Sequence, residues 1–127
     1  MQSKRVFKLK TFARWARKIL TDDQLCAAAQ EVLAGLYEAE LGGGVCKKRI
    51  ALAGQGKSGS TRTLIAKNSP HGLFFMAGRS KNDPGSDFSA AALSQVQIIA
   101  PDLHAASLVQ LEGAIQDGYL EEICHDA

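Results

Sequence analysis

Two arginines, Arg62 and Arg79, are placed opposite each other by the pattern of the sequence around them. Residues 61–67 and 73–78 are typical of strands, and a turn of Asn, Ser, Pro, His and Gly joins them. If this turn centres near Pro70, paired positions have numbers that sum to about 141, so Arg62 faces Arg79. Opposite residues have Cβ atoms about 5 Å apart, and like charges that close destabilise a sheet unless they bind an anion. The hairpin therefore predicts an anion site.

Further cations and small polar residues are predicted at the same end of the sheet. A glycine-rich turn, residues 54–60, precedes the hairpin, a basic strand precedes that turn, and two polar residues follow shortly after Arg79. Glycines free backbone N–H groups to point at an anion, and an arginine fork binds two phosphate oxygens at once. The residues that extend the basic edge in this way are Lys47, Lys48, Arg49, Lys57, Ser58, Ser60, Lys81 and Asn82.

Such a group of cations suits metal-free cleavage of RNA. In that reaction the 2′-hydroxyl attacks the adjacent phosphate, and fixed cations neutralise the extra negative charge. A base takes the hydroxyl proton and an acid protonates the leaving oxygen; a lysine whose pKa is lowered by cationic neighbours can be the base. The alternative is a solvated basic edge without catalysis. The candidate catalytic residues are Arg62, Arg79, Lys81 and Lys57, and the candidate RNA-binding residues are Lys47, Lys48, Arg49, Ser58, Ser60 and Asn82.

The histidines and carboxylates do not predict a second site. His71 falls in the hairpin turn, roughly 30 Å along the strand from Arg62. His104 falls in a predicted helix, and His125, near the end of the chain, is an outside candidate only. The basic end has no paired carboxylates, which disfavours a two-metal nuclease. We therefore expect neither a metal nor another cofactor.

A competing motif lies in residues 51–58, Ala-Leu-Ala-Gly-Gln-Gly-Lys-Ser, which fit the loose form of a phosphate-binding P-loop. Ala51 replaces the leading glycine. Residues 61–65, which follow, are strand-like, whereas a P-loop opens a helix. No clean apolar strand ends in an aspartate that could hold magnesium. These three departures disfavour an NTPase.

The charges are segregated along the chain. Residues 1–81 carry fifteen basic and five acidic side chains, a net charge of +10, whereas residues 82–127 carry eight acidic side chains and no Lys or Arg. A basic stretch beside an acidic one attracts a polyanion to one side of a small protein, and nucleic acid is the commonest polyanion. We expect the acidic third to help keep nucleic acid to one face.

Length and pattern predict a single α+β domain over residues 1–127. A small antiparallel sheet is expected, with N-terminal helices packed on it and additional C-terminal helices. Thr21, with Gln24 three residues on, predicts the start of the second helix by a capping box, and the glycine run 42–44 stops any continuation. This interpretation puts Tyr37 on the helix. The predicted strands are 5–10, 45–52, 61–67, 73–78 and 119–124, and the helices are 11–19, one from Thr21, 88–100 and 102–117.

Within the C-terminal third, Pro101 is expected to end the helix that begins at Phe88, because proline lacks the N–H that a helix interior needs. Asp102 can then cap a further helix.

Three cysteines, Cys26, Cys46 and Cys124, are far apart and odd in number. This spacing favours reduced, mostly buried thiols in a cytoplasmic protein over a disulfide framework or a zinc site. The basic N-terminus lacks the apolar segment of a signal peptide, and no apolar run approaches the ~20 residues of a membrane span. We therefore expect no membrane partner.

The chain resembles the RelE/HigB-type toxins of bacterial type II toxin–antitoxin systems, most specifically a RelE-like subfamily. The resemblance spans nearly the whole sequence, and its most specific part is the glycine–lysine stretch with the arginine that follows. The segments that carry it are Phe12–Lys18 (Phe-Ala-Arg-Trp-Ala-Arg-Lys), Leu41–Ile50 (Leu-Gly-Gly-Gly-Val-Cys-Lys-Lys-Arg-Ile), Gly54–Gly59 (Gly-Gln-Gly-Lys-Ser-Gly), Arg62–Leu64, Lys81-Asn82 and Asp117–Ile123.

The resemblance implies a compact RelE/ParE-like fold and metal-independent, ribosome-dependent cleavage of mRNA, blocked by a cognate antitoxin. By match, Arg62 takes the place of the strand arginine that contacts the scissile phosphate. Arg79 or Lys81 would be the second cation, and residues 47–49 would hold the RNA backbone. The general base is left unassigned.

Two departures from the subfamily leave alternatives open. Thr61 stands where an aromatic residue usually precedes the strand arginine, and an aromatic is also missing from residues 78–84. Either RNA is read differently or activity is reduced. A non-catalytic binding protein with the same fold and a gyrase-directed, ParE-like toxin are therefore the alternative functions, because fold alone does not fix function.

Overall fold

The computed structural model describes residues 4–52, 60–80, 83, 85 and 87–125. Strands come first and last in the described chain, with two helices after the first strand and two before the last. The strands are β1 (Arg5–Leu9), β2 (Ala39–Gly42), β3 (Val45–Ala51), β4 (Ser60–Ala66), β5 (Gly72–Arg79) and β6 (Leu120–Ile123), and the helices are α1 (Lys10–Ala16), α2 (Asp22–Leu33), α3 (Ala90–Ala105) and α4 (Leu108–Gln116). The predicted α+β fold class is confirmed.

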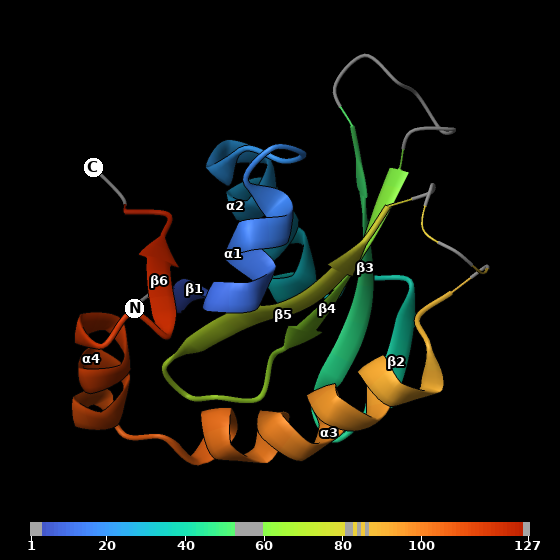
Figure 1. The fold of residues 1–127 in the computed structure, drawn as a ribbon. Coiled ribbons are helices and arrows are strands. Elements are labelled where there is room, and N and C mark those ends of the chain that lie inside the picture. The colour runs from blue at the N-terminus through green and yellow to red at the C-terminus, as the bar shows by residue number, and fades with distance from the viewer. Residues whose placement is uncertain (1–3, 53–59, 81–82, 84, 86, 126–127) are drawn as a thin grey trace.

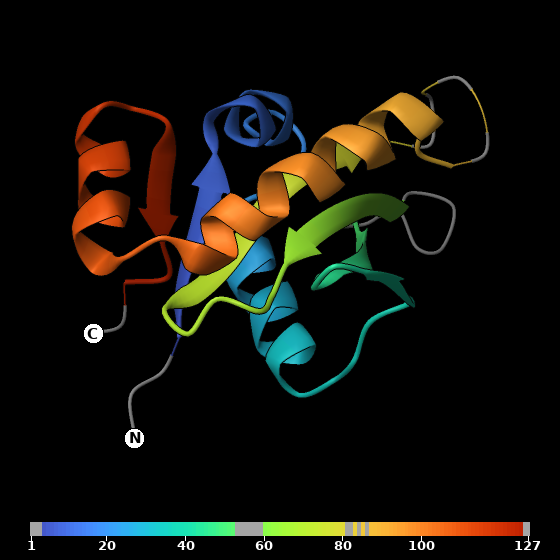
Figure 2. The same ribbon diagram turned by 90° about the horizontal axis from the view of Figure 1, so that it is seen from below.

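One six-stranded sheet, in the order β2-β3-β4-β5-β1-β6, lies between two layers of helices (Figure 1). Helices α1 and α2 cover one face, and α3 crosses the other, as the view from below shows (Figure 2). Leu64 and Ile65 are neighbours on β4 and point to opposite faces. Ile65 packs in one core with Leu25 of α2, and Leu64 packs in the other core with Val96 of α3. The sheet is therefore buried on both sides over its centre.

Strands β3, β4 and β5 form the predicted antiparallel hairpins, and a shift in register between Leu64 and Ile65 is the one irregularity of the β4–β5 pairing. The pairing of β1 differs from the all-antiparallel expectation. β1 runs parallel to β5, with Arg5 beside Gly72, and antiparallel to β6. Turn signals in a sequence predict only the pairing of consecutive strands. Three strands and two helices separate β1 from β5 along the chain, so no turn signal links them.

Helix α2 begins where the capping box predicts and ends earlier than expected. The Thr21 hydroxyl accepts a hydrogen bond from the Gln24 N–H (3.1 Å), and the Gln24 side chain accepts one from the Thr21 N–H (2.8 Å). The helix stops at Leu33, and Gly35 takes a left-handed φ of 85°, which favours glycine. The prediction that Tyr37 lies on the helix was wrong: it lies in the connection to β2, a strand that the sequence analysis missed.

The prediction that Pro101 ends a helix was also wrong, because α3 continues through it to Ala105. Ala100 is fully buried and Leu103 packs against the same core on the other side of the proline. This packing outweighs the one helical hydrogen bond that proline removes. Asp102 therefore does not cap a helix, and the next one, α4, is capped by Ser107.

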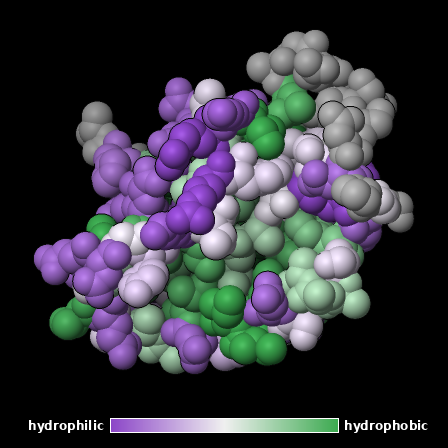
Figure 3. All heavy atoms as spheres, in the orientation of Figure 1, coloured by the Kyte–Doolittle hydropathy of each residue, from purple (hydrophilic) through white to green (hydrophobic). Residues whose placement is uncertain are grey.

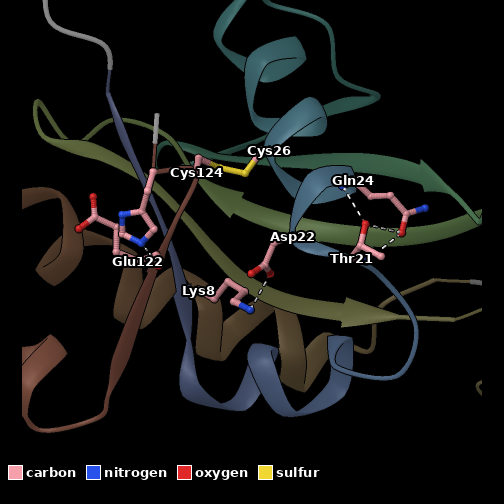
Figure 4. The surroundings of a disulfide bond; sticks show 8 residues. Lys8, Thr21, Asp22, Gln24, Cys26, Glu122 and Cys124 are labelled. Carbon is pink, nitrogen blue, oxygen red and sulfur yellow. Dashed lines mark hydrogen bonds and ion pairs between the residues drawn. A yellow bond between two sulfur atoms is a disulfide. The ribbon is translucent and has the colours of Figure 1, made fainter. Parts of the chain in front are cut away.

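The expectation of reduced thiols was wrong for two of the three cysteines. Cys26 of α2 and Cys124, just after β6, form a disulfide with 5.6 Å between their Cα atoms (Figure 4). Cys46 is a free, buried thiol, as predicted. The two cysteines are 98 residues apart in sequence. Only the fold, in which β6 pairs with β1, reveals that they lie close to each other.

The charges that are segregated in sequence meet in space where β6 pairs with β1. Arg5 of β1 forms ion pairs with Glu122 of β6 and Glu112 of α4, both at 2.7 Å. Lys8, also on β1, is 9 % exposed at its side chain and lies 3.7 Å from Glu121. The hydrogen bonds from Arg5 lower the pKa of Glu122. In this part of the molecule the acidic third neutralises basic side chains and does not form a separate face.

Candidate functional site

Three arginines lie in a row across the sheet near the ends of β3, β4 and β5. Arg49 is paired with Arg62, and Arg62 is paired with Arg79, as the hairpin pattern predicted for the second pair. Residues directly opposite each other point to the same face of a sheet. This arginine row (Arg49, Arg62, Arg79) therefore lies on the face that carries α3, because Leu64, two residues from Arg62, packs in the α3 core.

An open pocket of about 260 Å³ lies beside the arginine row. Lys47 joins it because it is two residues before Arg49 on β3 and therefore shares its face. Two carboxylates also line this pocket, which the sequence analysis did not anticipate. The pocket is lined by Glu38, Ala39, Lys47, Arg49, Arg62 and Asp87.

The two carboxylates are held in different ways. The Glu38 side chain accepts a hydrogen bond from the backbone N–H of Arg49 at 2.6 Å. Asp87 forms an ion pair with Lys47, with 2.6 Å between Oδ2 and Nζ. The hydrogen bond from Lys47 lowers the pKa of Asp87, and the charge of Arg62 contributes to the same shift. No spacing rule links these acids to the basic strands, so only the fold could reveal them.

Arg79 is the buried member of the arginine row, with 7 % of its surface exposed. Its guanidinium donates hydrogen bonds to the carbonyl oxygens of Asp83 (3.0 Å), Gly85 (2.7 Å) and Asp87. Its Nε has no hydrogen-bond partner among the residues that the structure describes. Arg79 thus fastens the chain that leads into α3, and no carboxylate of the described chain forms an ion pair with it.

Lys48 lies apart from the arginine row. Its side chain points to the α2 face, where Nζ lies 3.0 Å from the Leu36 carbonyl oxygen and 2.9 Å from a carboxylate oxygen of Glu31. It is buried there. The alternation of a strand explains the separation of Lys48 from Lys47 and Arg49.

Of the five remaining candidate residues, the structure describes only Ser60. Ser60 begins β4 opposite Ala51, two residues before Arg62 and therefore on the same strand face. The candidates Lys57, Ser58, Lys81 and Asn82 lie outside the described residues.

None of the histidines lines the pocket beside the arginine row. His71 lies in the β4–β5 turn, as predicted. His104 lies on α3, where burial lowers its pKa, and His125 follows β6 with its ring 3.1 Å from the Glu122 carbonyl oxygen. Within the described ranges, no group of three or more His, Cys, Asp or Glu side chains is arranged to hold a metal ion.

An apolar groove lies apart from the arginine row, between α1 and the pair α3 and α4. It consists of two adjoining cavities of about 300 and 540 Å³ that share Leu9, Thr11 and Ile99. Figure 3 shows hydrophobic side chains gathered over the lower middle of the view, where α3 lies in Figure 1. The exposed cations Lys10 and Arg14 line its α1 side. None of its lining residues also lines the pocket beside the arginine row.

Comparison with known families identifies the chain. Residues 4–123 match the family described as the RelE toxin of the RelE/RelB toxin–antitoxin system. The chain belongs to the RelE toxin family. The match runs from β1 through β6 and confirms the resemblance seen in the sequence. Among curated proteins there is no match.

RelE-family toxins pair with antitoxins, so this chain is the toxin component of a toxin–antitoxin system. No helix in the described parts of this RelE-family toxin is both long and apolar enough to cross a membrane.

The structure gives a physical account of one departure in this RelE-family toxin. Thr61 is fully buried and points away from the arginine row, because it is adjacent to Arg62 on β4. Its hydroxyl donates a hydrogen bond to the Ile50 carbonyl oxygen at 3.0 Å. Position 61 therefore faces the α2 core and does not offer a surface on which an RNA base could stack beside Arg62.

Proposed function

We propose that this RelE-family toxin is an endoribonuclease that cleaves mRNA on the ribosome without a metal ion and is held inactive in the cytoplasm by its cognate antitoxin. The observation that carries this proposal is the arginine row beside an open pocket. Arg62 and Arg49 present guanidinium groups to the pocket, and Lys47 adds a third cation. Fixed cations of this kind stabilise the charge that develops on a phosphate during cleavage.

The roles proposed within the arginine row differ with exposure. Arg62, half-buried and lining the pocket, is the proposed contact to the scissile phosphate. Lys47 and Arg49 are proposed to bind flanking phosphates, which fix position without reading sequence. Arg79 is the proposed second cation: three of its N–H groups donate to the carbonyl oxygens of Asp83, Gly85 and Asp87, so it acts on the phosphate through its charge and by positioning these residues.

The roles of the remaining candidate residues are proposed from the sequence. Lys57 and Lys81 stay candidate catalytic residues. Ser58, Ser60 and Asn82 stay candidate RNA-binding residues. Lys48 is the weakest of the set, because its ammonium is engaged on the opposite face of the sheet.

Induced expression in bacteria, with primer extension to map mRNA 5′ ends, tests the proposal. Wild type is expected to arrest growth and to produce new in-frame cuts in translated messages. Arg62→Ala is expected to lower cleavage about 100- to 1,000-fold, the usual cost of removing one group that stabilises developing negative charge. Arg17→Ala is the matched control, because it removes one arginine charge from an exposed position at the end of α1, outside the pocket. Its cleavage should equal that of wild type.

Two other outcomes identify the alternative functions. Growth arrest without mRNA cuts, accompanied by DNA damage, would indicate that gyrase is the target of the toxin. No arrest from soluble protein would assign a binding role without catalysis. Cleavage that persists undiminished in Arg62→Ala would remove Arg62 from the site.

A further inference from the structure

One carboxylate already occupies the cationic pocket. Oδ2 of Asp87 lies 2.6 Å from Nζ of Lys47, and Oδ1 accepts a hydrogen bond from the backbone N–H of Phe88 at 2.7 Å. Arg62 and Arg49 line the same pocket. A carboxylate offers one negative charge and two acceptor oxygens, which is also what a phosphodiester offers through its two non-bridging oxygens. Asp87 thus presents to Lys47 the chemistry expected of a bound phosphate.

The backbone around Asp87 is held in place from β5. Arg79 donates hydrogen bonds to the carbonyl oxygens of Asp83, Gly85 and Asp87 itself. Two residues after Asp87, Ser89 caps α3 by accepting a hydrogen bond from the Ala92 N–H at 3.1 Å. Because both sides of Asp87 are fastened, its carboxylate stays near the pocket even when it is not bonded to Lys47.

The bond between Asp87 and Lys47 is nevertheless easy to exchange. The Asp87 side chain is 48 % exposed, and exposed ion pairs contribute little free energy because water screens both charges. The Oδ1 hydrogen bond to Phe88 is local and does not depend on Lys47. A phosphate can therefore take the place of Oδ2 at Lys47 while the backbone keeps its position.

We propose that Asp87 is an internal competitor that occupies the place of a phosphodiester beside Lys47 and Arg62, so that RNA must displace its carboxylate to bind. The inference rests on the proposed function for the identity of the ligand. As a consequence, the affinity of the toxin for RNA is lower than its cations alone would give.

The test measures binding of a 2′-O-methyl RNA oligonucleotide, which cannot be cleaved, by fluorescence anisotropy at several KCl concentrations. Asp87→Asn removes the charge and keeps an oxygen for the Phe88 N–H. This variant is expected to bind roughly threefold to fivefold more tightly at low salt. The plot of log affinity against log salt should become steeper by about 0.7, since one cation is no longer offset within the binding site.

Asp117→Asn is the matched control, because Asp117 is an exposed acid at the end of α4, next to β6 and not to β3. It should leave affinity and salt dependence unchanged. The effect of Asp87→Asn should also shrink when Lys47→Ala is present, since the competition concerns Lys47. An equal gain from Asp117→Asn would mean that net charge alone is responsible, and would overturn the proposal. So would a gain from Asp87→Asn that Lys47→Ala does not reduce, or no gain at all.

Pyrophosphate, followed by NMR shifts of the Lys47 and Arg62 side-chain signals, separates this proposal from the proposed function. Tighter pyrophosphate binding by Asp87→Asn, with no RNA binding by any variant, would support the competitor and overturn the RNA-directed function. If neither wild type nor Asp87→Asn bound pyrophosphate or RNA, the pocket would hold no phosphate and the competitor would be refuted.

Discussion

The disulfide between Cys26 and Cys124 is expected to contribute a large share of the stability of the oxidised protein. The two residues are 98 apart in sequence, and closing a loop of about 100 residues in the unfolded chain stabilises the folded state by about 4.7 kcal/mol in the chain-entropy account. Domains of this size unfold with about 5–15 kcal/mol. Reduction should therefore remove between a third and nearly all of the stability, and lower the Tm by roughly 15–20 °C.

The measurement is unfolding in urea and by heat, followed by circular dichroism, for the oxidised and the reduced protein. The double variant Cys26→Ser, Cys124→Ser should match the reduced wild type and should not respond to reductant. Titration of thiols after unfolding supplies the check on the bond itself: one thiol, that of Cys46, is expected when oxidised, and three when reduced. Burial raises the pKa of the Cys46 thiol to about 12, so this group should not react in the folded protein.

Two results would refute this reasoning. Three free thiols in protein purified without reductant would show that the bond does not form. A single free thiol with unfolding free energies of oxidised and reduced protein within about 1 kcal/mol would show that the link does not restrict the unfolded chain as the loop length requires.

Three further predictions concern single side chains. Gly78→Ala places a Cβ against the ring of Trp15, closer than two carbon atoms can approach, so we expect a loss of about 1–3 kcal/mol in urea unfolding; an unchanged midpoint would mean that the indole moves freely. Arg79→Lys keeps the charge but not the fork that reaches three carbonyl oxygens, and it should cost about 2 kcal/mol and speed amide exchange at Asp83, Gly85 and Asp87; exchange as slow as in wild type would contradict this. Arg5 lowers the pKa of Glu122 in the folded state, so this pair stabilises the protein above the ordinary pKa of a glutamate and loses its effect as the pH falls through the lowered value; Glu122→Gln should flatten that acid limb of the stability curve, and an unaltered limb would assign it to other acids.

The pairing of Arg62 with Arg79 could be predicted from the sequence because its cause is local. A turn of known chemistry fixes the register of the strands on either side of it, and register fixes which side chains are opposite. The place of Arg49 beside Arg62 depends on the β3–β4 register, which the sequence analysis did not predict and the structure supplies. The capping box of Thr21 is local in the same sense.

Features that depend on long-range contacts could not be predicted in this way. The parallel pairing of β1 with β5 and the disulfide each join segments that no turn connects. Pro101 obeys a local rule that tertiary packing overrides, since Ala100 and Leu103 hold the helix on the sheet. Local chemistry gives the preference of a segment, and the burial of neighbouring side chains decides whether the preference is followed.

The site itself shows why a count of charges does not describe a binding surface. The sequence assigns Lys47, Lys48, Arg62 and Arg79 one positive charge each, but the fold gives them different surroundings. Lys48 is paired with Glu31 on the far face, and Lys47 is paired with Asp87 inside the pocket. Arg79 donates three of its N–H groups to carbonyl oxygens, while its Nε has no hydrogen-bond partner among the described residues, so most of its donors are used within the protein although its charge remains. Arg62 is the member of this set that lines the pocket without an ion pair to any described carboxylate, which is why its substitution is the most direct test of the site.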